Sequence, residues 1–363
     1  MAATDKDIEQ KKSAIQFCVS VGMIPFYEVD VTNVTDFGDK PETLTDIDVI
    51  GVYRNNYRTG RVAFDCKTSK TSPINRAFWA AGIANYISAA ESYVILKRAA
   101  PESHRVSAKS MRVHLFDESQ FKQHAQALSF QPIFINNYLT DMDRWHGLHA
   151  IFKSNFQFER LGTYLRQVVP LDVDSPKIVR GIIANLRQAK GEFDPEKLSN
   201  LAVFFYSLMG FSLAMSTVVQ EVFNSFDPKQ SKEEFENFLR DYIWGGRESY
   251  QLRKKLQEAL AAKLDRTQPE FDLNAWEDFI ALVRSLIDSP ESVFLCCLPL
   301  AGCSLRALGA LDMQSDMLLK EQLSKNNRQR QFIFGMSKYL VAASGLPKDM
   351  DEKVKEVINQ VMG

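Results

Sequence analysis

The sequence predicts an α/β domain, with a mixed sheet flanked by helices, followed by an all-α domain. Two observations indicate this fold class. Short β-type runs alternate with helical periodicity up to about residue 128, and strand signals then fade while helical periodicity continues. We therefore expect a first domain over residues 1–128 and a helical domain over residues 129–363. A chain of 363 residues is long enough to hold two such domains.

The first domain has the predicted element order α-β-β-β-α-β-β-α. Apolar residues at helical spacing cover residues 6–20, and Gly22 ends that helix. Because the polar segment RNNYRTG separates two of the β-type runs, these two read as a hairpin. The expected strands are 26–31, 46–53, 61–68, 92–98 and the end of 105–117, and the other expected helices are 74–88 and 119–128.

The second domain is expected to contain only helices. Breaks that contain Pro, Gly, Asp, Asn or Ser separate most of them, and the expected segments are 140–168, 176–189, 195–224, 231–242, 248–265, 273–287, 291–310, 314–343 and 350–362. Segment 201–219 contains no charged residue, and its length is close to the ~20 residues that a bilayer-spanning helix needs. Its small polar residues favour a buried central helix, and a membrane-associated helix is the alternative.

Composition is that of an ordinary globular protein, with 45% hydrophobic residues, 25% charged residues and a net charge of −1. The five cysteines form no CxxC pair, which fits a reducing compartment. The polar N-terminus lacks the apolar stretch of a secretory signal, so a cytoplasmic protein is expected. The sequence contains no phosphate-binding glycine loop, serine-hydrolase elbow or HExxH motif, which argues against those classes of enzyme.

Charge is distributed unevenly along the predicted first domain. Residues 28–48 hold seven acids and one base, whereas residues 54–112 hold eleven bases and three acids, a local net charge of +8. An acidic cluster beside a basic surface suits a metal-dependent enzyme that acts on a polyanion. The alternative is a solvated surface of mixed charge.

Two neighbouring predicted strands carry acids among apolar residues. Strand residues of equal parity share a face, so pairing in a hairpin would bring Asp48 beside Asp65, with Lys67 next to them. Two carboxylates and a backbone carbonyl, for which that of Cys66 is the natural candidate, match the oxygen ligands of Mg²⁺ or Mn²⁺. Such an ion could lower the pKa of a water molecule and stabilise charge on a phosphodiester. Lys67 could position that water or neutralise the developing charge.

The arrangement of Asp48, a hairpin and then Asp65-Cys66-Lys67 resembles the PD-(D/E)XK, or restriction-endonuclease-like, nuclease superfamily. The resemblance covers about residues 6–120, through a leading helix, Gly22, a strand, TDIDVIG, VAFDCKTSK, a helix and a further strand. It implies a restriction-endonuclease-like fold in which Asp48 and Asp65 bind a divalent metal and Lys67 assists hydrolysis.

The chain departs from the pattern of that superfamily in two ways. Asp-Ile-Asp stands where Pro-Asp is usual, which makes Asp46 a competitor of Asp48, although an exposed position at the start of the strand is expected for Asp46. The triplet begins with Asp65 where Glu is commoner. Many members add an acid on the first helix, and the candidates here are Glu9 on that helix and Glu28 on the following strand.

Basic and polar residues surround the triplet in the sequence. Lys70, Asn75 and Arg76 suit contacts to a phosphate backbone, or they form a solvated loop and helix start. The three arginines of RNNYRTGR are expected beside the proposed site. A structural alternative pairs Asp48 and Asp65 with Lys67 and Arg61 as salt bridges, but such a buried set is a weak stabiliser compared with apolar packing.

A second group of titratable residues occurs in DRWHGLH. His146 and His149 are three residues apart and would share a helix face, with Asp141 and Asp143 nearby. Because no third ligand pattern supports a metal site, we expect a surface or interdomain role for the two histidines.

The sequence thus predicts a Mg²⁺- or Mn²⁺-dependent nuclease that hydrolyses phosphodiester bonds, with DNA as the expected substrate and bacterial defence as a plausible setting. The helical domain would serve recognition, assembly or regulation, through homo-oligomers or a protein partner. The alternative is a catalytically silent module of nuclease fold whose helical domain docks a protein partner. The least favoured hypothesis is a membrane-linked effector anchored through 201–219.

Overall fold

The computed structural model describes residues 5–33, 42–55, 58–68, 71–129, 136–227, 229–263 and 272–363. The chain forms two compact units, each assembled from separate segments. Unit 1 comprises Met1–Ala150, Arg166–Leu171 and Leu308–Leu318. Unit 2 comprises Ile151–Leu165, Asp172–Ala307 and Leu319–Gly363. This division differs from the expected boundary after residue 128, because the segment that follows the first domain in sequence makes its contacts with that domain.

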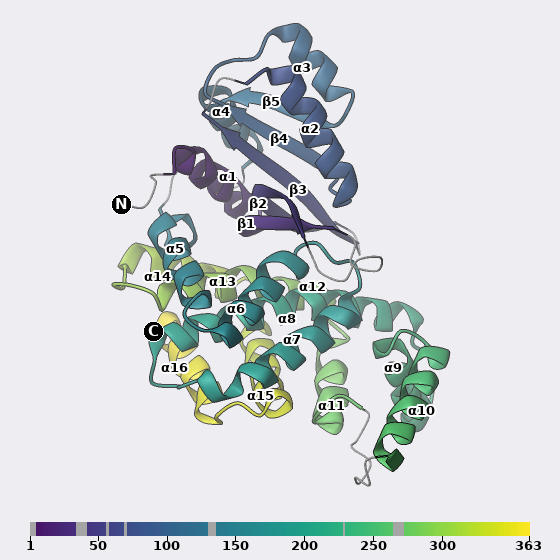
Figure 1. Cartoon of the computed structure of the whole chain (residues 1–363). Coiled ribbons are helices and arrows are strands. Elements are labelled where there is room, and N and C mark those ends of the chain that lie inside the picture. Colours follow the sequence, from purple (N-terminus) through teal and green to yellow (C-terminus); the bar gives the residue numbers. More distant parts are fainter. Residues whose placement is uncertain are drawn as a thin grey trace. The chain divides into compact units, whose positions relative to one another are not determined.

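Unit 1 is an α/β unit, and from α1 to α4 its elements follow the expected order with one additional helix, α3 (Figure 1). Its described elements are α1 (Ile8–Ser20), β1 (Ile24–Thr32), β2 (Thr43–Asn55), β3 (Arg58–Lys67), α2 (Pro73–Tyr86), β4 (Glu91–Leu96), α3 (Glu102–Lys109), β5 (Val113–Asp117), α4 (Glu118–Leu128), the short η2 (Tyr138–Thr140) and most of α5 (Met142–Phe152).

The strands that the structure describes form one five-stranded sheet in the order β1-β2-β3-β4-β5. β1, β2 and β3 pair antiparallel, whereas β3, β4 and β5 pair parallel. The difference follows from the connections, because parallel neighbours need a crossover, and α2 and α3 provide the two crossovers. The predicted mixed sheet is therefore confirmed.

Helices cover both faces of this sheet. On one face, aromatic rings of α1, β3, β4 and α4 pack together; these are Phe17, Phe64, Tyr93 and Phe121. On the other face, α2 and α3 bury a smaller cluster that includes Ala77, Ala108, Val94 and Leu115. Asp65 is the partner of Val94 in the β3–β4 pairing, so Asp65 lies on the α2 face of the sheet.

Unit 2 is mainly helical, as expected for the C-terminal part. Its helices, with the two that extend into unit 1, are α6 (Phe156–Thr163), η3 (Tyr164–Val168), α7 (Ser175–Ala189), η4 (Lys190–Glu192), α8 (Leu198–Ser225), α9 (Lys232–Ile243), α10 (Arg247–Lys263), α11 (Trp276–Leu286), α12 (Pro290–Phe294), α13 (Cys297–Arg306), α14 (Met313–Leu323), α15 (Gln329–Ser344) and α16 (Asp349–Met362).

Three segments expected as single helices are interrupted: 140–168, 291–310 and 314–343. Asparagine explains two of the interruptions. Asn155 caps α6 by accepting a hydrogen bond from the amide of Phe158 at 2.8 Å. Asn326, between α14 and α15, accepts one from the amide of Arg328 at 2.8 Å. A side chain that bonds the nearby backbone competes with the helical ladder, so these residues favour helix ends over helix interiors.

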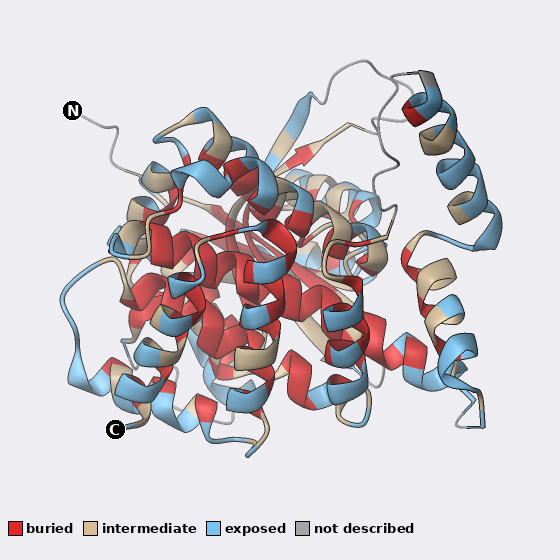
Figure 2. Ribbon diagram, turned by 90° about the horizontal axis from the view of Figure 1, so that it is seen from below, coloured by how far each residue is buried: buried red, intermediate tan, exposed pale blue. Residues whose placement is uncertain are grey.

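The charge-free segment lies within α8, which is buried inside unit 2. Figure 2 colours the buried residues of the chain red. The most apolar window of α8 has a mean hydropathy of 1.7 and is 94% buried. The hydroxyl of Ser212 donates to the carbonyl of Val293 at 2.8 Å, and that of Ser304 donates to the carbonyl of Ala202 at 2.8 Å. The expected burial of a central helix is therefore found. By length and composition, α8 and the bent pair of Trp276–Leu286 and Pro290–Arg306 are the described segments that could cross a membrane.

Candidate active site

The register of the β2–β3 hairpin brings the three predicted catalytic residues together. Val49 pairs with Phe64, and Asp48 and Asp65 are the next residues beyond that pair on the two strands. Nζ of Lys67 lies 3.8 Å from Oδ2 of Asp48 and 3.7 Å from Oδ1 of Asp65. Asp48 is 4% exposed and Asp65 is 6% exposed. Two buried carboxylates therefore share one ammonium at the end of the hairpin.

Asp48 is held at this point by the backbone of the neighbouring strand. Its Oδ2 accepts a hydrogen bond from the amide of Cys66 at 2.7 Å. Burial raises the pKa of the Asp48 carboxyl to about 6, while Lys67, the Cys66 amide and Lys11 offset part of that rise. The predicted metal-binding carbonyl of Cys66 belongs to the same residue, and its thiol is fully buried.

Asp65 is held by α2, which begins six residues after β3 ends. Arg76, in the first turn of α2, donates from Nε and Nη2 to the two carboxylate oxygens of Asp65. The guanidinium of Arg76 also lies 3.6 Å from the centre of the Trp79 ring. Of the other predicted phosphate-binding residues, Asn75 is exposed on α2, and Lys70 lies outside the described residues.

Lys11 of α1 is a cluster residue that the sequence interpretation missed. Its Nζ lies 2.8 Å from Oδ2 of Asp5, 3.1 Å from Oε1 of Glu28 and 3.4 Å from Oδ1 of Asp48. Burial alone would lower the pKa of Lys11, but these carboxylates hold it above its usual value. A signal exists in the sequence, because Lys11 lies three residues after Ile8 and four before Ile15, on the helix face expected to be buried.

Glu28 occupies an unusual place in β1. Tyr27 pairs with Val49 and Val29 pairs with Ile47, so Glu28 lies opposite Asp48. Its φ is 49°, in the left-handed region that residues other than glycine rarely adopt. Local backbone strain of this kind is typical of sites whose surroundings hold one conformation.

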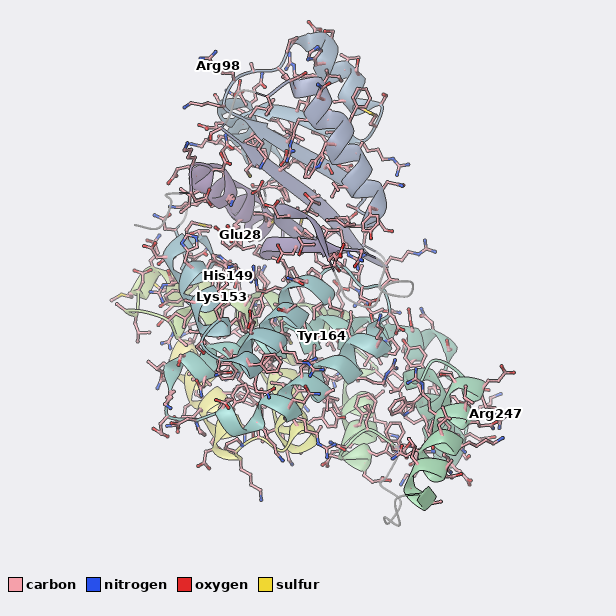
Figure 3. The ribbon with its side chains drawn as sticks, viewed as in Figure 1. Glu28, Arg98, His149, Lys153, Tyr164 and Arg247 are labelled. Carbon is pink, nitrogen blue, oxygen red and sulfur yellow. The ribbon has the colours of Figure 1, made fainter. Side chains whose placement is uncertain are left out.

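Side chains of three other residues contact Glu28, and Figure 3 labels Glu28 and one of the three, His149. Besides Lys11, Nδ1 of His149 lies 3.7 Å from Oε2 of Glu28, and Nη2 of Arg166 donates to its backbone carbonyl at 2.8 Å. His149 and then Lys11 hold the pKa of Glu28 well below its usual range, against the opposing effect of burial. Burial lowers the pKa of His149 to about 4, so the imidazole is neutral at pH 7.

The two histidines of α5 therefore differ. His146 is exposed, as expected, and its Nε2 lies 3.1 Å from the hydroxyl of Tyr27. His149 is buried, and its ring stacks on Tyr27 with centroids 5.3 Å apart, so of the two roles expected, surface or interdomain, the surface role does not apply to His149. The periodicity of α5 shows that the two residues share a face but not that strand β1 covers it. Asp141, one of the two acids near these histidines in the sequence, forms a salt bridge with Arg144, whose Nε lies 3.0 Å from Oδ2 of Asp141.

The remaining candidates lie away from the cluster. Asp46 is exposed and lies opposite Asp30 in the β1–β2 pairing, as expected for a strand-entry acid. Glu9 is exposed on α1, next to neither Asp48 nor Asp65 in any described contact. The structure thus places Glu28 in the cluster and Glu9 outside it.

The expected position of the hairpin arginines is wrong. Arg54 pairs with Thr59 and Arg58 pairs with Asn55, at the turn end of the hairpin. Asp48 lies six residues from Arg54 along β2, or about 20 Å at the rise of an extended strand. Nε of Arg61 donates to the carbonyl of Pro170 at 2.6 Å. The described salt bridges of Asp48 and Asp65 are with Lys11, Lys67 and Arg76.

Carboxylate oxygens, such as those of Asp48 and Asp65, are ligands that Mg²⁺ and Mn²⁺ prefer. Within the described residues, no group of three or more His, Cys, Asp or Glu side chains could hold a metal ion. Mg²⁺ usually takes one or two carboxylates and fills its other positions with water and substrate phosphates. A carboxylate has about four lone-pair positions, so the two hydrogen bonds from Arg76 leave each oxygen of Asp65 able to accept once more.

Comparison with known proteins gives no relative for this chain. No protein-family model matches it, and no curated protein or solved structure matches it. The resemblance to PD-(D/E)XK nucleases therefore depends on the residues of the hairpin and their order, and function has to be argued from the geometry of the cluster itself.

Proposed function

We propose that unit 1 carries a Mg²⁺- or Mn²⁺-dependent nuclease site of the restriction-endonuclease-like type, with DNA as its substrate. The observation that carries the proposal is the convergence of the buried carboxylates of Asp48 and Asp65 on the ammonium of Lys67. Two buried acids beside one lysine are costly to maintain for stability alone, which favours a functional reason for keeping them.

Each residue has a distinct role in the proposed reaction. Asp48 and Asp65 hold the divalent ion, which supplies charge stabilisation and lowers the pKa of the attacking water. Lys67 places a positive charge beside both carboxylates, where the phosphodiester gains negative charge as the bond breaks. Arg76 fixes the plane of the Asp65 carboxylate through two parallel hydrogen bonds. The amide of Cys66 holds Oδ2 of Asp48 through a single hydrogen bond.

The test is cleavage of supercoiled, linear and single-stranded DNA and of RNA by the full chain, with Mg²⁺, Mn²⁺ or EDTA. Asp48→Asn and Lys67→Met should each lower the rate at least about 100-fold, the cost of removing one group that stabilises charge in a transition state. Asp46→Asn is the matched control, because it neutralises an exposed acid on the same strand, and it should cleave like the wild type.

Two results would contradict the proposal in different ways. Cleavage that persists in both Asp48→Asn and Lys67→Met, with unchanged circular dichroism spectra, would exclude this cluster as the site. A wild-type chain that binds nucleic acid but cleaves none of the four substrates would favour the silent module.

The silent module has one observation in its favour. Each carboxylate of the cluster already has a cationic partner, through Lys11 for Asp5, Glu28 and Asp48, and through Arg76 for Asp65. A self-neutralised cluster is compatible with a structural role. Metal-dependent cleavage that is lost in Asp48→Asn would decide against it.

A further inference from the structure

Lys11 is the most enclosed cation of the cluster. Its side chain is 9% exposed, compared with 25% for Lys67 and 20% for Arg76. Its ammonium lies within 3.4 Å of three carboxylates, those of Asp5, Glu28 and Asp48. An ammonium is compact and carries one positive charge, so Lys11 places that charge among three carboxylates that would otherwise repel one another.

The surroundings of Glu28 fix the place of this ammonium. Glu28 adopts a left-handed backbone conformation inside a strand, which is unfavourable for an L-residue. Arg166 binds its carbonyl and His149 lies beside its second carboxylate oxygen, so the first oxygen is directed at Lys11. Asp5 accepts from the same ammonium. The strained residue is thus part of the arrangement that places Lys11.

Asp48 divides its two oxygens between two cationic positions. Oδ1 faces Lys11 at 3.4 Å, whereas Oδ2 accepts from the amide of Cys66 and lies 3.8 Å from Lys67, on the side of Asp65. In two-metal phosphodiesterase sites the ions lie ~3.5–4 Å apart, close enough for a carboxylate to reach both. Here the ammonium of Lys11 occupies the cation position beside Oδ1 of Asp48. The cation position beside Oδ2 is the one that Asp48 shares with Asp65.

The charges of the described cluster agree with a single ion. Among the charged side chains that ion pairs join, four carboxylates, those of Asp5, Glu28, Asp48 and Asp65, face three cations, Lys11, Lys67 and Arg76, whereas Arg166 bonds only the backbone carbonyl of Glu28. The cluster is therefore one charge negative when all are ionised. One divalent ion and one phosphodiester bring it to neutrality, whereas a second divalent ion would leave a buried excess of two positive charges, which is unfavourable.

We infer that Lys11 is a built-in cation that takes the place of a second divalent ion, so that the site binds one Mg²⁺ or Mn²⁺, with Asp5 and Glu28 as positioning residues for Lys11. This inference rests on the proposed function. It also assigns the acid of β1: Glu28 holds Lys11 and is not a metal ligand. The same surroundings that favour the ammonium would accept a metal ion if the ammonium were removed.

The experiment starts from the full chain without metal and adds Mn²⁺ stepwise. The electron paramagnetic resonance signal of free Mn²⁺ then gives the number of ions that the chain has bound. The wild type should bind one ion at the cluster, and Asp48→Asn should abolish that binding. Lys11→Met should bind two ions and give the spectrum of a coupled pair. Lys12→Met removes a less buried charge from the same helix and should keep one ion. Lys11→Arg keeps the positive charge and should also keep one ion.

The outcomes separate this inference from the nuclease proposal. Two ions in the wild-type cluster would overturn the inference even if the chain cleaves DNA, and so would a folded Lys11→Met that still binds one. Absence of Mn²⁺ binding in the wild type would overturn both. Should Lys11→Met not fold, the wild-type count and Lys11→Arg decide the question. Glu28→Gln should weaken the interaction that positions Lys11, and its Mn²⁺ affinity and spectrum should therefore differ from those of the wild type. If both equal those of the wild type, Glu28 is not a positioning residue for Lys11.

Discussion

At the scale of the residue, the properties of Asp48 follow first from burial. The pKa of its carboxyl rises from its ordinary value of 3.8 to about 6. A pKa that is higher in the folded chain than in the unfolded chain means that the folded chain binds the proton more tightly. Asp48 therefore contributes most to folding below pH 3.8, and this contribution is lost as the pH rises through about 6.

Asp48→Asn should remove this pH dependence. In EDTA, the free energy of unfolding of the wild type minus that of Asp48→Asn should fall by about 3 kcal/mol between pH 3 and pH 7. Other titrating groups are common to both proteins, so most of their effects cancel in the difference. Urea unfolding of both proteins at a series of pH values measures this difference in the free energy of unfolding. A difference that stays constant over this range would show that the folded environment does not raise this pKa.

Glu28 permits a second test, because its backbone conformation is unfavourable for any residue with a Cβ. Glu28→Ala and Glu28→Gly both lose the carboxylate, but glycine adopts a φ of 49° without the steric cost. The glycine variant should therefore be more stable than the alanine variant by about 1 kcal/mol, measured by urea unfolding.

The same two substitutions at Asp46 are the control for the Glu28 comparison. Asp46 is exposed on β2 and its φ is not positive, so alanine should be more stable than glycine there. If alanine is the more stable residue at both positions, the backbone at Glu28 is not strained as described.

At the scale of the element, the sequence predicted the sheet because its signals are local. Period-2 patterns and the polar segment between 53 and 61 define the hairpin, and equal parity on its strands was enough to expect Asp48 beside Asp65. Parity gives the face of the sheet on which a residue lies, whereas the register also gives its distance from the turn. The register places Arg54 and Arg58 at the turn end, far from Asp48, although they are close to it in sequence.

The neighbours that complete the cluster come from other elements, so no local pattern identifies them as partners of Asp48, Asp65 or Glu28, although helical periodicity places Lys11 on a buried face. Lys11 reaches Asp48 from α1, and Arg76 reaches Asp65 from α2. His149 reaches Glu28 from α5, 121 residues later in the chain. A carboxylate in a strand pattern predicts that some partner exists, because an unpaired buried charge is costly. Which partner is chosen depends on how helices pack, and a single sequence does not specify that packing.

At the scale of the whole molecule, spatial grouping and chain order differ. Unit 1 includes α5 residues up to Ala150 and two later segments, Arg166–Leu171 and Leu308–Leu318. Its core explains the first of these additions. Trp145 of α5 is fully buried, its ring lies 6.0 Å from that of Tyr27 on β1, and its Nε1 donates to the carbonyl of Leu139 at 2.8 Å. The fading of strand signals marks a change of element type, not the edge of a compact unit.

Trp145→Ala in the full chain tests this division. Replacing a fully buried Trp by Ala costs about 3–5 kcal/mol, and the cost should fall on unit 1. Hydrogen exchange measured by mass spectrometry should show faster exchange in β1 and α1, with unchanged protection in α8 of unit 2. Phe158→Ala is the matched control, because Phe158 is buried in unit 2 against Phe193, with ring centroids 5.2 Å apart. It should give the opposite result, with faster exchange in the helices of unit 2 and unchanged protection in β1. If Trp145→Ala instead loosens α8 as much as β1, α5 belongs with the helical unit and the boundary expected from the sequence is the better one.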